Sequence, residues 1–218
     1  GEISHTPQEP KSTDDVLIKL EMPQAVLGMT VNLEYQLVDP GAYISFSDAA
    51  YSNTWTSVPM TYGNDAYEVI LDASIQQHRR LVRYRVRING DANGPIMLPY
   101  ADDSQPNFGY YVYDGLTTFG SYDLSTMEQV PVVQLIAKGS DVSSYILTGS
   151  SSDYLSTGTI VYNGQVYDHV AFRAQGRQQR HERPKRNIKF NLNKGHGIVM
   201  YDNYGNPRET RDKIVLHG

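Results

Sequence analysis

The 218-residue sequence contains no cysteine and a single tryptophan, Trp55. The lack of cysteine excludes disulfides, thiolate nucleophiles and every zinc or iron–sulfur site built on cysteine. No apolar run approaches the roughly 20 residues that a membrane-spanning helix requires, so we expect no membrane span. With a formal net charge of -5 the chain as a whole does not favour nucleic acid, and we expect no nucleic-acid partner.

Strand patterns fill the first half of the chain. Tyrosine is frequent, at 17 residues, which is typical of half-buried pleated surfaces. Alternation of apolar and polar residues recurs in several short segments, namely 16–23, 29–39, 42–48, 57–74 and 80–90. Short strands separated by turns predict an antiparallel β-sandwich of immunoglobulin or fibronectin-III type over residues 14–112, with a small barrel as the alternative. The polar residues 1–13 are expected to form a disordered leader.

The clearest alternation lies in residues 81–88. One side carries Leu81, Arg83, Arg85 and Arg87, and the other carries Val82, Tyr84, Val86 and Ile88. After this strand the amino-acid composition changes, and we interpret residues 113–129 as a linker rich in aromatic residues, proline and glycine. Six aromatic residues lie in residues 99–131, before and within this linker: Tyr100, Phe108, Tyr110, Tyr111, Tyr113 and Phe119. They predict either the apolar core of a domain interface, which the prolines and glycines favour, or a platform that stacks on sugars.

Residues 130–218 predict a mixed α+β lobe, so the whole chain is expected to be mainly β. A buried strand is expected in residues 130–139, followed by a short helix from Ser140 to Gly149. The pair Asn163-Gly164 is a strong signal for a two-residue β-hairpin turn. Strands are also expected near 186–194 and at the end of the chain.

One run, "RAQGRQQRHERPKRNIKF" at residues 173–190, gathers seven cations against one acid, Glu182. Cations on an ordered loop suit a phosphate-rich ligand, because their hydrogen bonds to phosphate are charge-assisted. The alternative is a solvated loop whose cations pair with acids such as Asp102, Asp103 and Asp153. Nucleic acid is not favoured, because the run contains no aromatic residue before Phe190.

The second half resembles the N-terminal lobe of CotH-like proteins, a family described as atypical, minimal protein kinases. The residues that carry this resemblance are Gly176, Arg180, Lys185 and the pair Lys189-Phe190, within "GRQQRHERPKRNIKFNLNKGH". The resemblance implies that Arg180, Lys185 and Lys189 bind the phosphates of ATP, with Mg²⁺, in the complete family domain. No catalytic residue and no metal ligand is assigned in this chain.

The resemblance also implies a wider setting. The residues that hold magnesium in the family lie downstream of the motif, so we expect a truncated lobe that is inactive alone and binds no cofactor tightly. The parent protein is expected to be a secreted or cell-surface bacterial-type protein, with the rest of its own chain and a secreted or surface protein substrate as partners. The alternative function is a non-enzymatic extracellular module for adhesion or carbohydrate association.

The six histidines are scattered, and we interpret them as surface or turn residues without a role in metal binding. Asp202 to Asn206 lacks the spacing of a calcium loop and predicts a β-turn. No nucleophile elbow of the Gly-x-Ser-x-Gly type occurs, so hydrolase chemistry has no support.

Overall fold

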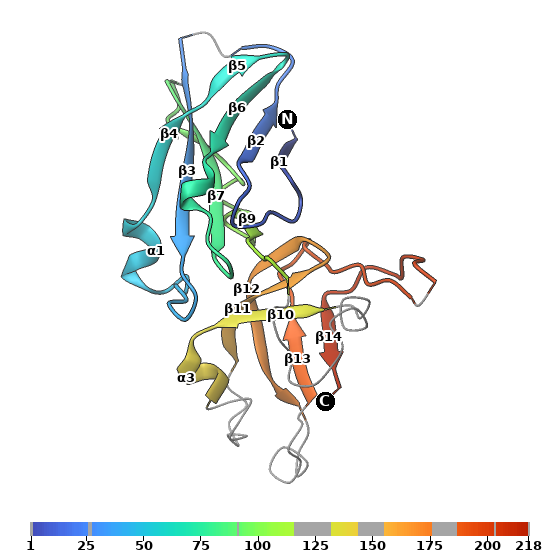
Figure 1. Ribbon diagram of the computed structural model, residues 1–218. Helices are drawn as coiled ribbons and strands as arrows, with labels where there is room; N and C mark the ends of the chain where they lie inside the picture. The colour runs from blue at the N-terminus through green and yellow to red at the C-terminus, as the bar shows by residue number, and fades with distance from the viewer. Residues whose placement is uncertain are drawn as a thin grey trace.

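The computed structural model describes residues 2–25, 28–90, 92–115, 132–143, 155–175, 187–202 and 204–217. These residues are mainly β, as predicted, and form three antiparallel sheets (Figure 1). Helix among them is short: α1 (Ala49–Asn53), the 3-10 turn η1 (Ala73–Ile75), and α3 (Gly139–Asp141), which is followed by the π-helical residues 142–143. No helix among these residues has the length and apolar character needed to cross a membrane.

Two sheets from the first half of the chain pack face to face. Sheet A contains, in spatial order, β1 (Ile3–Thr6), β2 (Val16–Glu21), β6 (Ala66–Leu71) and β5 (Thr61–Gly63). Sheet B contains β4 (Thr56–Pro59), β3 (Thr30–Val38), β7 (Leu81–Asn89) and β8 (Ile96–Leu98), and β9 (Phe108–Tyr111) also pairs with β7. This spatial order is that of an immunoglobulin-type sandwich, with strands A-B-E-D opposite strands C′-C-F-G.

The predicted alternation in β7 determines which residues fill this sandwich. Its even-numbered residues, Val82 to Ile88, join the core with apolar residues of β2, β3 and β6. The odd-numbered arginines therefore lie on the opposite face of sheet B. Arg85 and Arg87 both pair there with Glu34 of β3.

Two local expectations for the first half differ from the structure. Residues 3–6, expected in a disordered leader, form β1 and pair in register with β2. Residues 42–48, expected as a strand, form a loop with turns that ends at α1. The alternation in this loop arises because Tyr43 and Ser45 are buried against the second half of the chain, while Phe46 remains 58% exposed.

The second half builds sheet C. Its strands follow one another in sequence order: β10 (Val133–Ala137), β11 (Ser156–Tyr162), β12 (Gln165–Gln175), β13 (Asn187–Asn191) and β14 (Lys213–Leu216). The predicted hairpin is confirmed, because Asn163 and Gly164 both have positive φ and join β11 to β12. This conformation is the one that an Asn-Gly turn supplies.

One face of sheet C carries its own core. Phe172 of β12, Phe190 of β13 and Ile214 of β14 pack there with Ile160 of β11. An arm formed by residues 196–211, held by the bridges Ile198–Arg211 and Tyr201–Pro207, adds Ile198 to this core. The arm continues outward beside β14 (Figure 1), and its tip is the predicted turn at Asp202, whose carboxylate accepts hydrogen bonds from the Tyr204 and Asn206 backbone.

The helix expected at Ser140 is partly described. α3 begins one residue earlier, after Lys138, and Ser140 lies within it and does not cap it. The remainder of the expected helix, up to Gly149, lies outside the described residues. The predicted linker, residues 113–129, is also mostly outside them, together with Phe119.

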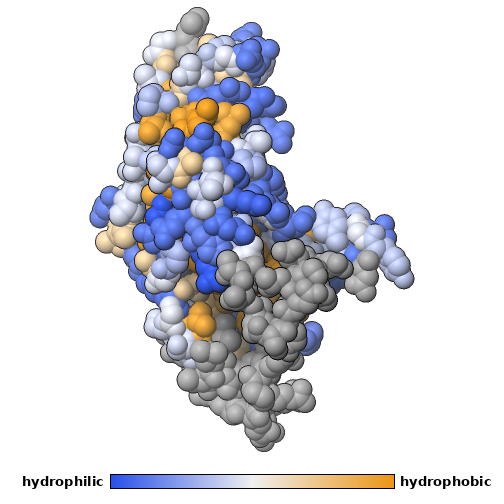
Figure 2. Space-filling view, viewed as in Figure 1, coloured by the Kyte–Doolittle hydropathy of each residue, from blue (hydrophilic) through white to orange (hydrophobic). Residues whose placement is uncertain are grey.

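The aromatic residues that precede the linker are divided between two environments. Tyr110 belongs to the sandwich core, so its placement in a domain interface was wrong, and Phe108 packs half-buried against that core. Tyr111 does contact the second half, in a small cluster with Leu81 of β7 and Val166 of β12. Tyr100 is 65% exposed, and Tyr113 stacks on His78. The face in Figure 2 is mostly hydrophilic, with a compact hydrophobic area over the upper part of the sandwich.

Candidate functional site

Of the three cations expected to bind phosphate, one is described. Arg180 and Lys185 lie in residues 176–186, outside the described ranges, and Lys189 lies on β13. Residues 176–186 connect the end of β12 to the start of β13, where Gln175 pairs with Asn187. This segment therefore connects two inner strands of sheet C.

Lys189 has a cation directly opposite. Its Cα partner in the antiparallel ladder is Arg173 of β12, and its partner on the other side is Val215 of β14. Because Phe172 and Phe190 point into the core of sheet C, Arg173 and Lys189 point to the opposite face, which we call the outer face. Lys213, opposite Asn191, lies diagonally across on the same face. Three cations thus share one end of the outer face.

The other end of the outer face is docked on the sandwich. Ile136 of β10 and Val166 of β12 pack there with Leu81 and Val38 of sheet B and with Tyr43 of the loop before α1. In Figure 1 this contact lies where the lower end of β7 meets β11 and β12. β12 therefore spans the whole site, with its start at the sandwich and its end at the cations.

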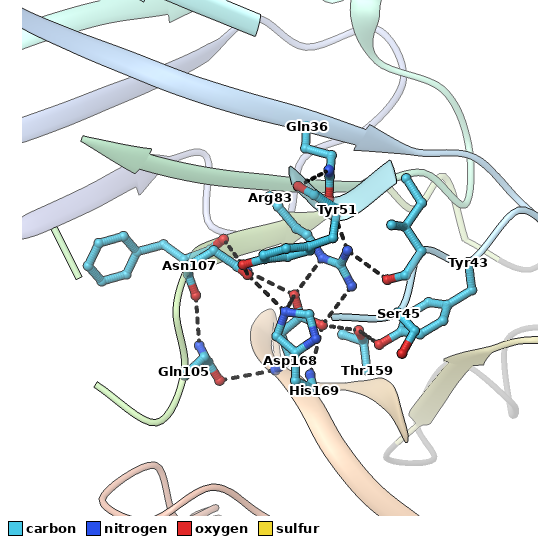
Figure 3. Close-up of polar contacts among 12 residues, drawn as sticks. Gln36, Tyr43, Ser45, Tyr51, Arg83, Gln105, Asn107, Thr159, Asp168 and His169 are labelled. Atoms are coloured by element: carbon cyan, nitrogen blue, oxygen red, sulfur yellow. Dashed lines mark hydrogen bonds and ion pairs between the residues drawn. The ribbon is translucent and has the colours of Figure 1, made fainter. Parts of the chain in front are cut away.

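A buried ion pair lies at the centre of this junction (Figure 3). Arg83 of β7 donates to Asp168 of β12 through Nε, at 2.6 Å, and through Nη2, at 3.1 Å. Both side chains are 0% exposed. A two-pronged contact of this kind is the strongest that an arginine makes with a carboxylate.

Both members of the pair form further hydrogen bonds with neighbouring residues. The Asp168 carboxylate accepts from the Thr159 hydroxyl, from Asn107 Nδ2 at 2.8 Å and from the His169 backbone N–H at 2.8 Å. Arg83 Nη1 donates to Gln36 Oε1 at 3.0 Å and to the carbonyl of Ile44. Two buried charges are tolerated only when they are paired and hydrogen-bonded in this way.

The pair remains ionised for electrostatic reasons. Burial by itself raises the pKa of Asp168, but the Arg83 charge and the hydrogen bonds hold that pKa far below its usual range. Burial disfavours the charged form of Arg83, yet the Asp168 carboxylate raises the pKa of Arg83 above its ordinary value. Each charge therefore stabilises the other, and neither changes protonation near neutral pH.

His169, which we interpreted as a surface or turn residue, is buried in this network. Its side chain is 7% exposed and packs against the rings of Phe46 and Tyr51. Burial lowers the pKa of His169 to about 4, so the imidazole is neutral at pH 7. Nε2 lies 3.0 Å from Asn107 Oδ1, while Nδ1 is buried with no hydrogen-bond partner in the described structure. The backbone φ of 55° at His169 turns the ring inward and explains the wrong interpretation.

Two irregular segments of the sandwich supply the rest of the network. The edge of sheet B is interrupted between β8 and β9, and the intervening residues bring Gln105 and Asn107 to β12. The loop and α1 between β3 and β4 bring Tyr51, whose hydroxyl donates to Asn107 Oδ1 at 2.9 Å. Local departures from regular strands therefore build the junction.

Polar contacts surround this junction. They are Ser45–Thr157, Lys138–Asp48, Gln8–Gly164, Ser104–Lys194 and His196–Asp103. In the last of these, His196 Nε2 lies 2.6 Å from Asp103 Oδ1. Asp103, which was one expected partner for the basic run, is thus engaged by another residue.

The chemistry of the junction suits a structural role, in which it holds the sandwich and sheet C together. The hydrogen bonds of Arg83 and Asp168 are all made to groups of the protein, and both side chains are closed to solvent. The described ranges contain no group of three histidine, aspartate or glutamate residues that could hold a metal ion. The surface chemistry at this site therefore lies in the cations on the outer face of sheet C.

No family model matches the chain, and no curated protein matches it.

Proposed function

We propose that this chain is part of a CotH-like protein in which the outer face of sheet C, with residues 176–186, binds the polyphosphate of a nucleotide. The observation that carries the proposal is the direct pairing of Arg173 and Lys189 across β12 and β13. The family motif supplies Arg180 and Lys185 in the segment that joins these strands.

The pairing of two cations favours an anionic ligand. Arg173, Lys189 and Lys213 bring three positive charges to one end of the outer face. A polyphosphate accepts charge-assisted hydrogen bonds from several cations at once.

The docked sandwich supports a rigid binding surface. β12 holds Asp168 in the buried junction and carries Arg173 five positions later. Positions on a strand that is fixed at its other end are held in place before the ligand arrives, and this reduces the entropy lost on binding.

The proposal covers nucleotide binding and not phosphoryl transfer. In the complete family domain, ATP is accompanied by Mg²⁺, and transfer requires residues that hold the metal and orient the nucleophile. The cations of the outer face fit the phosphates, but no acidic group for the metal is assigned among the described residues. Export, and a secreted or surface protein as the substrate of the parent protein, belong to the same proposal.

A thermal-shift experiment with ATP and Mg²⁺ tests this function. A ligand at a hundred times its Kd stabilises a protein by about 2.7 kcal/mol, which corresponds to a Tm increase of roughly 5–10 °C for a chain of this size. We expect such an increase with ATP and with inorganic tripolyphosphate, and its loss in Lys189→Ala, Arg180→Ala and Lys185→Ala.

Lys19→Ala is the matched control, because Lys19 is a half-buried strand lysine in sheet A, which shares no strand with sheet C. This variant should retain the full response to both ligands. An absent response in the wild-type protein, or an equal response in all variants, would rule out the proposed site.

A further inference from the structure

A cleft of about 500 Å³ lies between the sandwich and the first residues of β12. On the sandwich side it is lined by β1 and by residues 105–109, which include the start of β9. On the other side it is lined by residues 165–167 and 195–197. Its volume lies within the range of small-molecule sites, roughly 300–1,000 Å³, and such sites occur preferentially at domain interfaces.

Aromatic rings supply the apolar part of the cleft. Tyr84 and Phe108 stack on each other with centroids 5.6 Å apart, and Tyr167 lies on the opposite wall. Tyr84 is almost fully buried, whereas Phe108 and Tyr167 are half-buried. Aromatic faces of this kind are suited to contact with the C–H groups of a sugar ring.

Neutral hydrogen-bonding groups supply the polar part. The cleft is lined by the exposed residues Gln8 and Gln165 and by the half-buried His5. Both ring nitrogens of His5 already have partners within the protein, whereas each amide offers both a donor and an acceptor. A sugar hydroxyl also donates and accepts, so it can be matched by such groups at every position.

The charge of the cleft separates it from the outer face of sheet C. Glu2 is the one acid in the described lining, which contains neither lysine nor arginine. His5 is held by the Tyr84 hydroxyl, at 3.1 Å, and by the Gln8 carbonyl, at 3.3 Å. A phosphate or a sulfated ligand would find no cation here, whereas a neutral ligand loses no solvation of charge.

We propose that this cleft is a binding site for a neutral saccharide, recognised by the Phe108 and Tyr167 rings together with the Gln8 and Gln165 amides. It lies at the opposite end of β12 from Arg173, so it does not depend on the nucleotide site.

The buried junction fixes the geometry of this cleft. Gln105 and Asn107, which line it, are both hydrogen-bonded to Asp168, through its backbone N–H and its carboxylate. Gln8 Nε2 also donates to the carbonyl of Gly164, at the turn beside the opposite wall. The two walls are therefore held at a set separation without a ligand, which favours affinity by preorganisation.

The test is isothermal titration of the protein with neutral oligosaccharides of cellulose, xylan, mannan, chitin and starch. We expect at least one of them to bind, and Ser4→Trp to weaken that binding by about tenfold or more by placing an indole in the cleft. Ser4 is an exposed residue of β1 that lines the cleft. Ser57→Trp, at an exposed position of β4 outside the cleft, should bind as the wild type does.

Gln165→Ala provides a second variant that removes one amide from an exposed position, and it should also bind more weakly. Circular dichroism melts verify that each variant is folded. The proposal is overturned if no oligosaccharide binds the wild-type protein. It is also overturned if folded Ser4→Trp and Gln165→Ala bind as tightly as Ser57→Trp. ATP is absent throughout, so failure here leaves the nucleotide experiment unaffected.

Discussion

The substitution Asp168→Asn removes the negative charge from the buried junction while it preserves the shape of the side chain. In the wild-type protein the carboxylate accepts two hydrogen bonds from Arg83 and one each from Thr159, Asn107 and the His169 backbone. After the substitution the Arg83 guanidinium remains buried without a counter-charge. An amide also has one donor group where the carboxylate had only acceptors.

The expected loss of stability is large. Removal of one partner from a fully buried ion pair costs about 3–5 kcal/mol, a substantial part of the 5–15 kcal/mol that is typical of a folded domain. With a urea m-value of about 3 kcal/mol per M, the unfolding midpoint should fall by about 1–2 M. The double substitution Arg83→Met/Asp168→Leu, which removes both charges, should recover much of the loss.

Urea unfolding followed by tryptophan fluorescence suits this measurement. Trp55 is the one tryptophan, and its ring contacts the edge of Tyr51, whose own ring lies 5.6 Å from the Arg83 guanidinium. Glu21→Gln is the control, because the Lys19–Glu21 pair lies in the same sandwich but its side chains are 35% and 57% exposed, so it should contribute about 0–1 kcal/mol. Equal losses in Asp168→Asn and Glu21→Gln would refute the reasoning.

Two other substitutions test the junction and sheet C. Because burial lowers the pKa of His169 from 6.5 to about 4, the unfolded chain binds a proton between these values that the folded protein excludes, so stability falls as the pH falls. Between about pH 7.5 and about pH 5 the free energy of unfolding should fall by about 2 kcal/mol because of this residue. The substitution His169→Asn should remove this pH dependence, since asparagine tolerates the positive φ. An unchanged pH dependence of urea unfolding in the variant would contradict this. In sheet C, Gly158→Ala places a Cβ 2.9 Å from the Ile136 carbonyl and should reduce the free energy of unfolding by about 1–3 kcal/mol. Gly63→Ala is the control, because its Cβ meets nothing within 4 Å. Similar Tm values for the two variants would show that the strands of sheet C shift to accommodate the methyl group.

Local sequence patterns predicted much of the fold. Alternation in residues 81–88 placed Val82, Tyr84, Val86 and Ile88 on the core face of a strand, and this is confirmed. The Asn163-Gly164 pair predicted the β11–β12 turn, because few residues other than glycine and asparagine adopt positive φ without strain. Signals of this kind are contained within a few residues and need no knowledge of distant partners.

The buried junction could not be predicted in the same way. Arg83, Arg85 and Arg87 share one face of β7, yet only Arg83 is fully buried, because Asp168 lies opposite it in the folded chain. A separation of 85 positions leaves no local signal of that contact. One indication was available in the sequence. Asp168 and His169 are adjacent polar residues within the apolar segment "VYDHVAF", and such a pair is unusual in a strand if its side chains face solvent.

The irregularities of the strands were equally hidden. The register of β11 and β12 shifts between Gly158 and Ile160, next to the positive φ of His169, and this irregularity directs His169 inward. β1 was missed because its four residues alternate too briefly to give a periodic signal. Its pairing with β2 and the contact of His5 with Tyr84 stabilise it in the fold.

The most direct test of the central claim is an NMR titration of the isotope-labelled protein with ATP and with tripolyphosphate. The account predicts that the backbone amides of Arg173, Lys189 and Lys213 shift with both ligands, while those at the saccharide cleft, such as Gly109, remain in place. Titrations in which the amides of β12 to β14 stay unchanged, or in which shifts appear only in the sandwich, would contradict the assignment of the phosphate site to the outer face of sheet C.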